Sequence, residues 1–142
     1  MRFVWALSTF AAVACAGSGA AVGSNNPVGT KVVAVDQDFD LAPAGTATID
    51  GGALTFTFDK VPGDSRCPTG VECIWAGNGA VVLTVAPAGA ASYSVQLNTT
   101  LAPHAATVGP YQIALVGLKP YPKQGSTIPP ASYIATLRIT RQ

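Results

Sequence analysis

The stretch GAVVLTVAPAGAASYSVQLN, residues 79–98, decides the fold of this chain. Residues 81–85 carry Val, Leu and Val at every second position, and residues 92–98 alternate Tyr, Val and Leu with Ser and Gln. A period of two places one set of side chains on a single face of an extended strand. The APAG between them, residues 86–89, has the Pro and Gly of a turn. The stretch therefore predicts two strands joined by a turn.

The same alternation recurs along the rest of the chain. Clear examples are residues 53–59, 111–118 and 132–140, and weaker ones are 31–35 and 47–49. Asp50-Gly51-Gly52 fits a tight hairpin. No helical pattern follows residue 20. We therefore expect an all-β domain, an antiparallel β-sandwich of about seven strands, with a small β-barrel as the alternative.

The composition agrees with strands and excludes two classes of partner. Charged residues make up 11% of the 142 residues, against about 25% in ordinary soluble proteins. The chain has 15 Gly and 11 Pro, which favour short strands and turns over helices. Its formal charge is only +1, so it lacks the basic footprint of a nucleic-acid binder. No apolar run is long enough to span a bilayer.

The first 20 residues read as an export signal. Arg2 precedes an apolar run over residues 3–14, which has the length of a signal-peptide core. Signal peptidase could cut after the small residues 18–20. Alternatively, AVAC resembles a bacterial lipobox, in which Cys15 becomes the lipidated first residue, although Ala12 stands where Leu is usual.

The cysteine count favours the second route. The chain has three cysteines, and an odd one in an exported protein needs an explanation. If Cys67 pairs with Cys73, Cys15 is left inside the lipobox. We therefore predict that Cys15 is lipidated, the alternative being that it is discarded with the signal peptide. Residues 16–30 then form a flexible tether and residues 31–142 the folded domain.

The densest chemistry lies in DSRCPTGVECIWAG, residues 64–77. We expect Cys67 and Cys73 to form a disulfide, worth about 2 kcal/mol in the chain-entropy model. A zinc or redox site would need C-x-x-C spacing or a second Cys pair, and His104 lies far along the chain. We also expect Trp75 or Ile74 to pack on the bridge.

The charged residues of this segment allow two interpretations. Asp64 can turn the loop, and Arg66 can pair with Asp64 or with Glu72. These contacts would make it a locally satisfied loop. The alternative is a recognition loop formed by Asp64, Arg66, Glu72 and Trp75, with Tyr121 from a later segment.

The stretch DQDFD could hold a cation. In an extended chain Asp36, Asp38 and Asp40 fall on one face and could gather calcium. An EF-hand loop is excluded because Leu41 stands where it needs Gly and Ala47 where it needs Glu. We favour the alternative, a solvated face that discourages edge pairing, and we predict no metal.

The segment LKPYPKQGSTIPP, residues 118–130, places Tyr121 between Lys119 and Lys123. Its prolines favour an extended path, which could bind a partner or a glycan or simply link one sheet to the other. Enzyme chemistry has little support, because His104 has no nucleophile motif nearby and no phosphate loop appears. We expect neither an enzyme nor a cofactor.

These residues resemble a group of small exported bacterial proteins without an established activity, many of them lipoproteins. The resemblance covers about residues 39–141 and lies in D-S-R-C-P, a second Cys, W-x-G, a later P-Y-P and a Tyr-led final strand. The residues that match its most specific part are Asp64, Ser65, Arg66, Cys67, Pro68, Cys73, Trp75 and Gly77. The resemblance implies a compartment and a domain type but no reaction.

The sequence thus predicts an exported, lipid-anchored binding or structural module of the cell envelope, whose partner is an envelope protein or a glycan. A second hypothesis is a protease inhibitor that presents the braced loop 68–72. A third, a hydrolase, would require a pocket where His104 or two carboxylates converge.

Overall fold

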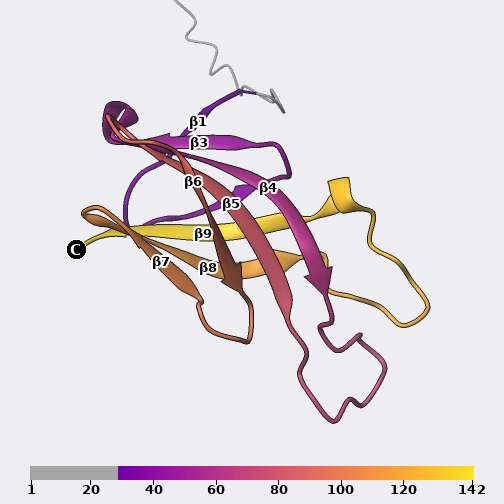
Figure 1. Ribbon diagram of the computed structural model, residues 1–142. Coiled ribbons are helices and arrows are strands. Elements are labelled where there is room, and N and C mark those ends of the chain that lie inside the picture. The colour runs from indigo at the N-terminus through magenta and orange to yellow at the C-terminus, as the bar shows by residue number, and fades with distance from the viewer. Residues whose placement is uncertain (1–28) are drawn as a thin grey trace, which may run out of the picture.

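The computed structural model describes residues 29–142, and Figure 1 shows them as strands joined by turns and loops. Nine strands and two short 3-10 turns make up the domain. In chain order they are β1 (Lys31–Val32), β2 (Asp38–Leu41), β3 (Thr46–Ile49), η1 (Asp50–Gly52), β4 (Leu54–Asp64), β5 (Gly79–Pro87), β6 (Tyr93–Asn98), β7 (Ala105–Val108), β8 (Tyr111–Lys119), η2 (Pro130–Ser132) and β9 (Ile134–Arg141).

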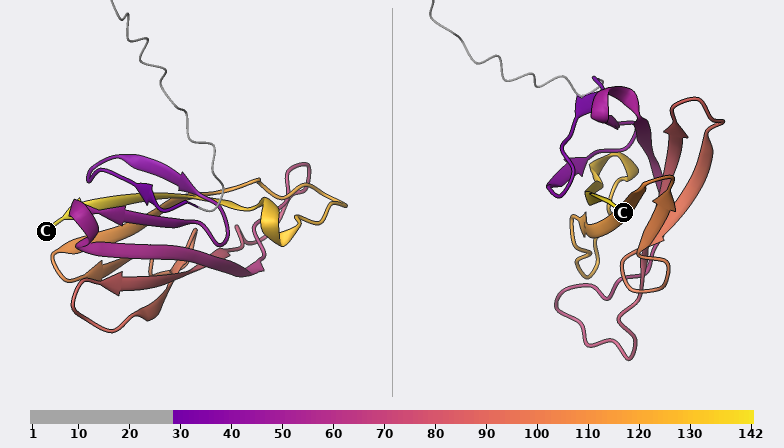
Figure 2. Two further views of the ribbon diagram at one scale, coloured as in Figure 1. Left: turned by 90° about the horizontal axis from the view of Figure 1, so that it is seen from above. Right: turned by 90° about the vertical axis from the view of Figure 1, so that its left-hand side faces the viewer.

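The strands form two sheets that pack face to face (Figure 2). One has the order β1-β3-β4-β5-β6 and the other β2-β9-β8-β7. All neighbours are antiparallel except β1 and β3. The prediction of an all-β sandwich is confirmed, and the sheets do not close into the alternative barrel.

The core fills the space between the sheets with the apolar faces that alternate along the strands. Phe56 and Phe58 of β4 are at most 1% exposed and oppose Val85 and Leu83 of β5 in register. The Phe39 ring of β2, in the other sheet, lies 5.7 Å from the Phe56 ring at a tilted angle of 46°. Such aromatic contacts add to the hydrophobic burial that holds the two sheets together.

Two of the nine strands, β2 and β7, go beyond the seven that the sequence predicts. In β2 the buried Phe39 and Leu41 alternate with exposed aspartates, but the run is only four residues long. The strand β7 consists of small residues, and its alternation is correspondingly weak. Both are edge strands that take their positions from β9 and β8, so pairing rather than local pattern determines them.

The connection from β8 to β9 differs from the sequence prediction. The expectation that it links one sheet to the other is wrong, because β8 and β9 are antiparallel neighbours in the same sheet. Residues 120–133 therefore form a long loop that returns to its own sheet. Binding of a partner or a glycan by this segment stays a prediction. This loop lies beside the segment that carries the disulfide, because the Thr69 amide donates a hydrogen bond of 2.9 Å to the Pro122 carbonyl.

The segment between β4 and β5 projects from one end of the sandwich. The β4–β5 register shifts between Phe58 and Gly63, and the inner face of β4 is no longer buried beyond Phe58. Such bulges bend and twist a strand, and the pair runs on past the core. Figures 1 and 2 show residues 64–79 at the end of the domain opposite to the point where the chain enters at residue 29.

The predicted signal segment, Cys15 and most of the tether lie outside the described residues. Within residues 29–142 the structure contains no helix with the length and apolar character needed to cross a bilayer.

Candidate functional site

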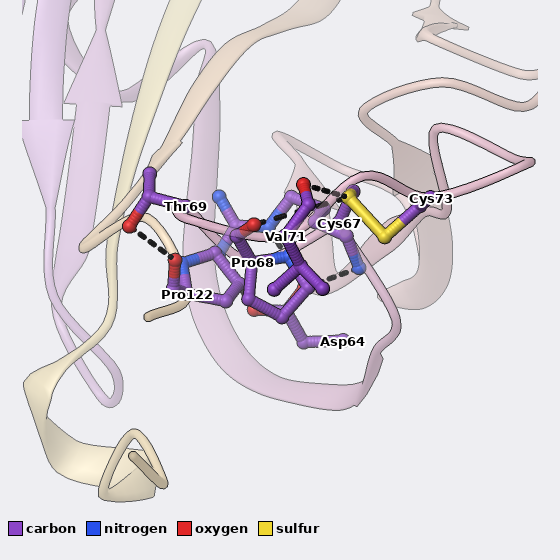
Figure 3. Close-up of a disulfide and its surroundings, with 8 residues drawn as sticks. Asp64, Cys67, Pro68, Thr69, Val71, Cys73 and Pro122 are labelled. Atoms are coloured by element: carbon purple, nitrogen blue, oxygen red, sulfur yellow. Dashed lines mark hydrogen bonds and ion pairs between the residues drawn. A yellow bond between two sulfur atoms is a disulfide. The ribbon is translucent and has the colours of Figure 1, made fainter. Parts of the chain in front are cut away.

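The projecting segment is closed by the predicted disulfide. Cys67 and Cys73 are bonded, with their Cα atoms 5.9 Å apart (Figure 3), an ordinary separation for a disulfide. Below the bridge, the Ser65 amide donates to the Asn78 carbonyl at 2.8 Å and the Cys67 amide donates to the Ala76 carbonyl at 3.0 Å. These bonds extend the β4–β5 ladder, so the disulfide closes the tip of a hairpin.

The hairpin is fixed to the domain through Arg66, whose side chain is only 5% exposed. Its Nε donates to Asp64 Oδ1 at 2.8 Å and one terminal nitrogen donates to Asp64 Oδ2 at 2.6 Å, which is the bidentate pairing of guanidinium and carboxylate. The remaining donors reach the carbonyls of Leu118 and Pro120. Arg66 therefore joins the hairpin to the end of β8.

Two tyrosines complete this clamp. The Arg66 guanidinium carbon lies 5.1 Å from the centre of the Tyr121 ring, within cation–π range. The Tyr133 hydroxyl donates to Asp64 Oδ2 at 3.2 Å. We call Asp64, Arg66, Tyr121 and Tyr133 the clamp. Of the two partners expected for Arg66, Asp64 is the one that it pairs with, and no feature of the sequence indicates that Arg66 also reaches the β8–β9 loop.

The charges of the clamp shift the acidities of its members. Burial raises the pKa of Asp64, but the hydrogen bonds and charge of Arg66, with the Tyr133 hydroxyl, outweigh burial and hold that pKa below its usual value. Burial and the neighbouring Asp64 carboxylate raise the pKa of Tyr133. At neutral pH Asp64 is therefore ionised, and the Tyr133 hydroxyl keeps its proton.

The tip of the hairpin presents apolar side chains to solvent. Ile74 is 93% exposed, Trp75 is 81% exposed and Val71 is 40% exposed. The prediction that Ile74 or Trp75 packs on the disulfide is wrong, because β5 begins only at Gly79 and both residues lie in the loop before it. We call Val71, Ile74 and Trp75 the apolar tip. Glu72, within it, is exposed and has no ionic partner among residues 29–142.

Around the bridge, backbone atoms complete the packing. The carbonyl oxygens of Pro68 and Val71 lie 3.8 and 3.6 Å from Cys67 Sγ (Figure 3). A disulfide sulfur carries no proton, so these are polar contacts. Thr69 forms an isolated parallel bridge with Lys123. Backbone contacts of Thr69 with the β8–β9 loop thus hold the start of the disulfide loop, and the exposed residues 71–75 are the part that can contact a partner.

The three predicted aspartates do not converge. Asp36 has a φ of 61° and leaves the extended path, so it does not share a face with the others. Asp38 pairs with Arg138 at 2.6 Å, and Asp40 pairs with Lys119 at 3.4 Å. A hydrogen bond from Thr136 is the largest influence on the pKa of Asp40 and lowers it, and Lys119 lowers it further, so that together they outweigh the opposing effect of burial. In the described part of the chain no group of three acidic, His or Cys side chains is placed to hold a metal ion.

His104 lies on the exposed connection between β6 and β7. Its Nδ1 is 2.9 Å from the Asn98 carbonyl oxygen, so the ring is bound to backbone. Another polar group, Asp50 with Tyr111 and Arg141, lies at the opposite end of the sandwich and joins η1 to β8 and β9. The hydrolase hypothesis requires a pocket where His104 or two carboxylates converge. The contacts of the His104 ring are to backbone, and the second group contains a single carboxylate, Asp50.

Sequence reasoning missed Asn78, which organises the surface beside the tip. Its side-chain oxygen accepts from the amides of Thr100 and Leu101 at 3.1 and 3.3 Å, and its side-chain nitrogen donates to Asn98 Oδ1 at 2.9 Å. The Gly-Asn-Gly context of residues 77–79 was an available signal, because Asn side chains commonly bond backbone at turns.

Comparison with protein-family models, with curated proteins and with solved structures found no match to this chain. The geometry of the hairpin therefore carries the functional inference.

Proposed function

We propose that this protein is an exported binding module of the cell envelope, which presents the apolar tip to a protein partner. One observation carries the proposal: Ile74 and Trp75, at 93% and 81% exposure, stand at the end of a hairpin that a disulfide and a buried Arg66 hold in place. If the disulfide hairpin served only to stabilise the fold, burying Ile74 and Trp75 against the domain would add to the stability.

Burial of the tip would supply binding energy at a small ordering cost. A large apolar side chain taken out of water contributes about 1.5–3 kcal/mol, and Trp is among the residues that dominate protein interfaces. Because the disulfide and the clamp already fix the backbone, little conformational entropy remains to be lost on association. A rigid knob of this kind suits insertion into a cleft of the partner.

Export and lipid anchoring belong to the same proposal. The disulfide is in keeping with an oxidising compartment, and Cys15 stands in a lipobox-like sequence. An N-terminal anchor would leave the hairpin at the far end of the domain, facing away from the membrane that holds the protein. Intact mass of the protein extracted from envelopes tests this: a lipidated Cys15 supports the anchor, and a mature chain that starts after Ala20 refutes it.

The binding function is tested by affinity capture from a crosslinked envelope extract. The unchanged protein, the variant Ile74→Ser/Trp75→Ser and the variant Val116→Ser are compared as baits. Val116 is an exposed apolar residue of β8, away from the tip, at 52% exposure. We expect a protein retained by the unchanged bait and by Val116→Ser and lost with the double variant. Identical retention by all three baits would refute a role for the tip.

Protease inhibition is the second candidate function, favoured by the outward direction of the loop side chains. Val71 is 40% exposed and Glu72 is also exposed. Against an extended inhibitory strand, the Thr69 amide is already bound to Pro122, and Gly70 turns the backbone with a φ of 87°. The test is to assay a panel of serine, cysteine and metalloproteases in the presence of micromolar concentrations of the protein. If none of these proteases is inhibited, protease inhibition is ruled out as the function.

A further inference from the structure

Beside the apolar tip lies a hollow of about 260 Å³. Trp75 and Leu101, which is 60% exposed, stand as its two apolar walls, and Ala76 and Gly77 contribute to its lining. The two walls come from different loops, the β4–β5 hairpin and the β6–β7 connection. The hollow therefore depends on how firmly these loops are joined.

Asn78 joins them. As described above, its side chain binds the backbone of Thr100 and Leu101 and the side chain of Asn98. The Gly79 amide donates to Thr99 Oγ1 at 2.8 Å, and the Thr99 amide donates to the Gly79 carbonyl at 3.0 Å. These bonds fix the distance between the walls before any ligand arrives.

The same bonds leave the hollow short of polar groups for a ligand. Ser65 Oγ donates to the Asn78 carbonyl at 3.2 Å and accepts from the Asn78 amide at 3.1 Å. The Asn78 side-chain oxygen already accepts two amides, and the side-chain nitrogen donates to Asn98 Oδ1. A sugar bound in the hollow would contact the aromatic Trp75 but would replace few of its hydrogen bonds to water. An apolar group has no such hydrogen bonds to lose.

We propose that the hollow receives one large apolar side chain of the protein partner, so that recognition combines the projecting Ile74 with a hole beside Trp75. This inference rests on the proposed binding function and specifies its partner. The volume is below the roughly 300–1,000 Å³ of pockets for drug-sized ligands and suits a single side chain. The occupant is a protein segment that carries Leu, Met or Phe at its anchor position.

Charge narrows the partner further. Glu72 precedes Trp75 by three residues, which limits their Cα separation to about 11 Å, and it has no ionic partner among the described residues. A carboxylate in the apolar tip disfavours an anionic bilayer and favours a segment with Lys or Arg beside its apolar anchor.

The test uses defined probes, so it does not require the natural partner. Acetyl-Leu-Arg-amide, acetyl-Leu-Glu-amide and N-acetylglucosamine are titrated to tens of millimolar into the 15N-labelled protein purified after export. We expect saturable shifts of the Trp75 indole, Leu101 amide and Asn78 side-chain signals with the leucine peptides, at about millimolar affinity. The Arg peptide should bind about two- to fivefold more tightly than the Glu peptide, and Glu72→Gln should remove that difference.

Two variants separate this inference from the proposed function. Leu101→Asn removes a wall at an exposed position and should weaken the leucine peptides about fourfold or more, because even one lost methylene contact costs that factor. Ile74→Ser leaves both walls of the hollow intact, so this variant should bind the leucine peptides with unchanged affinity. Shifts absent from Trp75 and Leu101, equal affinity for Leu101→Asn, preference for the sugar, or a blue shift of Trp75 fluorescence on anionic vesicles would each overturn the inference. These results are independent of the capture experiment, in which the variant Ile74→Ser/Trp75→Ser tests the proposed binding function.

Discussion

Replacing Arg66 by Ala should destabilise the domain far more than replacing Arg138 by Ala. The two arginines each contact an aspartate at 2.6 Å, but the Arg66–Asp64 side chains are 5% and 6% exposed whereas those of Arg138 and Asp38 are 48% and 40% exposed. The pairs thus differ mainly in burial. Loss of Arg66 also leaves the carbonyls of Leu118 and Pro120 without their donor.

The expected magnitudes follow from that difference. Removing one partner of a buried ion pair costs about 3–5 kcal/mol, because the remaining charge stays buried and uncompensated. An exposed pair is worth about 0–1 kcal/mol. For a domain of this size about 1 kcal/mol changes the melting temperature by about 4 °C. Arg66→Ala should therefore lower the melting temperature by about 12–20 °C, and Arg138→Ala by about 4 °C or less.

Circular dichroism of the strand signal is the suitable assay, because Trp75 is exposed in the folded state and reports unfolding poorly. Thermal and urea unfolding of both variants and of Arg66→Lys would be compared at neutral pH. The lysine variant keeps the charge but not the planar fork, and it should lie between the alanine variant and the unchanged protein. Equal losses for Arg66→Ala and Arg138→Ala would refute the buried clamp.

Three further predictions address the same hairpin. Replacing Cys67 and Cys73 by Ser should destabilise by about 2 kcal/mol, seen as a lower melting temperature; an unchanged value would contradict a bracing role. Gly77→Ala should destabilise by about 3 kcal/mol or more, since its φ is 69° and a Cβ would lie 1.7 Å from the Ser65 carbonyl oxygen. Gly109→Ala, with a φ of 59° and nothing within 4 Å, should cost only about 1 kcal/mol, and equal urea midpoints for the two would contradict this. Because the folded-state pKa of Asp64 is lowered, its carboxylate stabilises the fold above the unfolded pKa and loses this effect as pH falls through the lowered value. The stability gap to Asp64→Asn should then narrow as the pH falls below about 4, the ordinary pKa of an unfolded Asp, whereas parallel acid profiles would refute the pairing.

The sequence determines the sandwich through its alternating apolar faces and the disulfide through its cysteine spacing. Period-two patterns predicted the inward faces of β4, β5, β8 and β9, because a strand buried on one face has apolar residues at every second position. The edge strand β7 shows no such pattern, since its small residues depend on pairing with β8.

The candidate site was predicted in part. Cys67 with Cys73 and Arg66 with Asp64 are close in sequence, so local spacing predicted the disulfide and offered Asp64 and Glu72 as partners for Arg66. The bonds from Arg66 to the β8–β9 loop and from Asn78 to the β6–β7 connection join distant segments and have no local signature. The orientation of Trp75 was mispredicted for a related reason: the register of β4 against β5 decides where the strand resumes, and the bulges in β4 shift that register.

Site-specific photocrosslinking in intact envelopes tests the central claim most directly. A photoreactive amino acid is placed at position 74 in the tip or at position 116 on β8, two exposed apolar positions on different parts of the surface. The account predicts a discrete crosslinked protein product from position 74, none from position 116, and loss of that product when Arg66→Ala releases the hairpin. Equal crosslinking from both positions, or a product that survives Arg66→Ala unchanged, would contradict it.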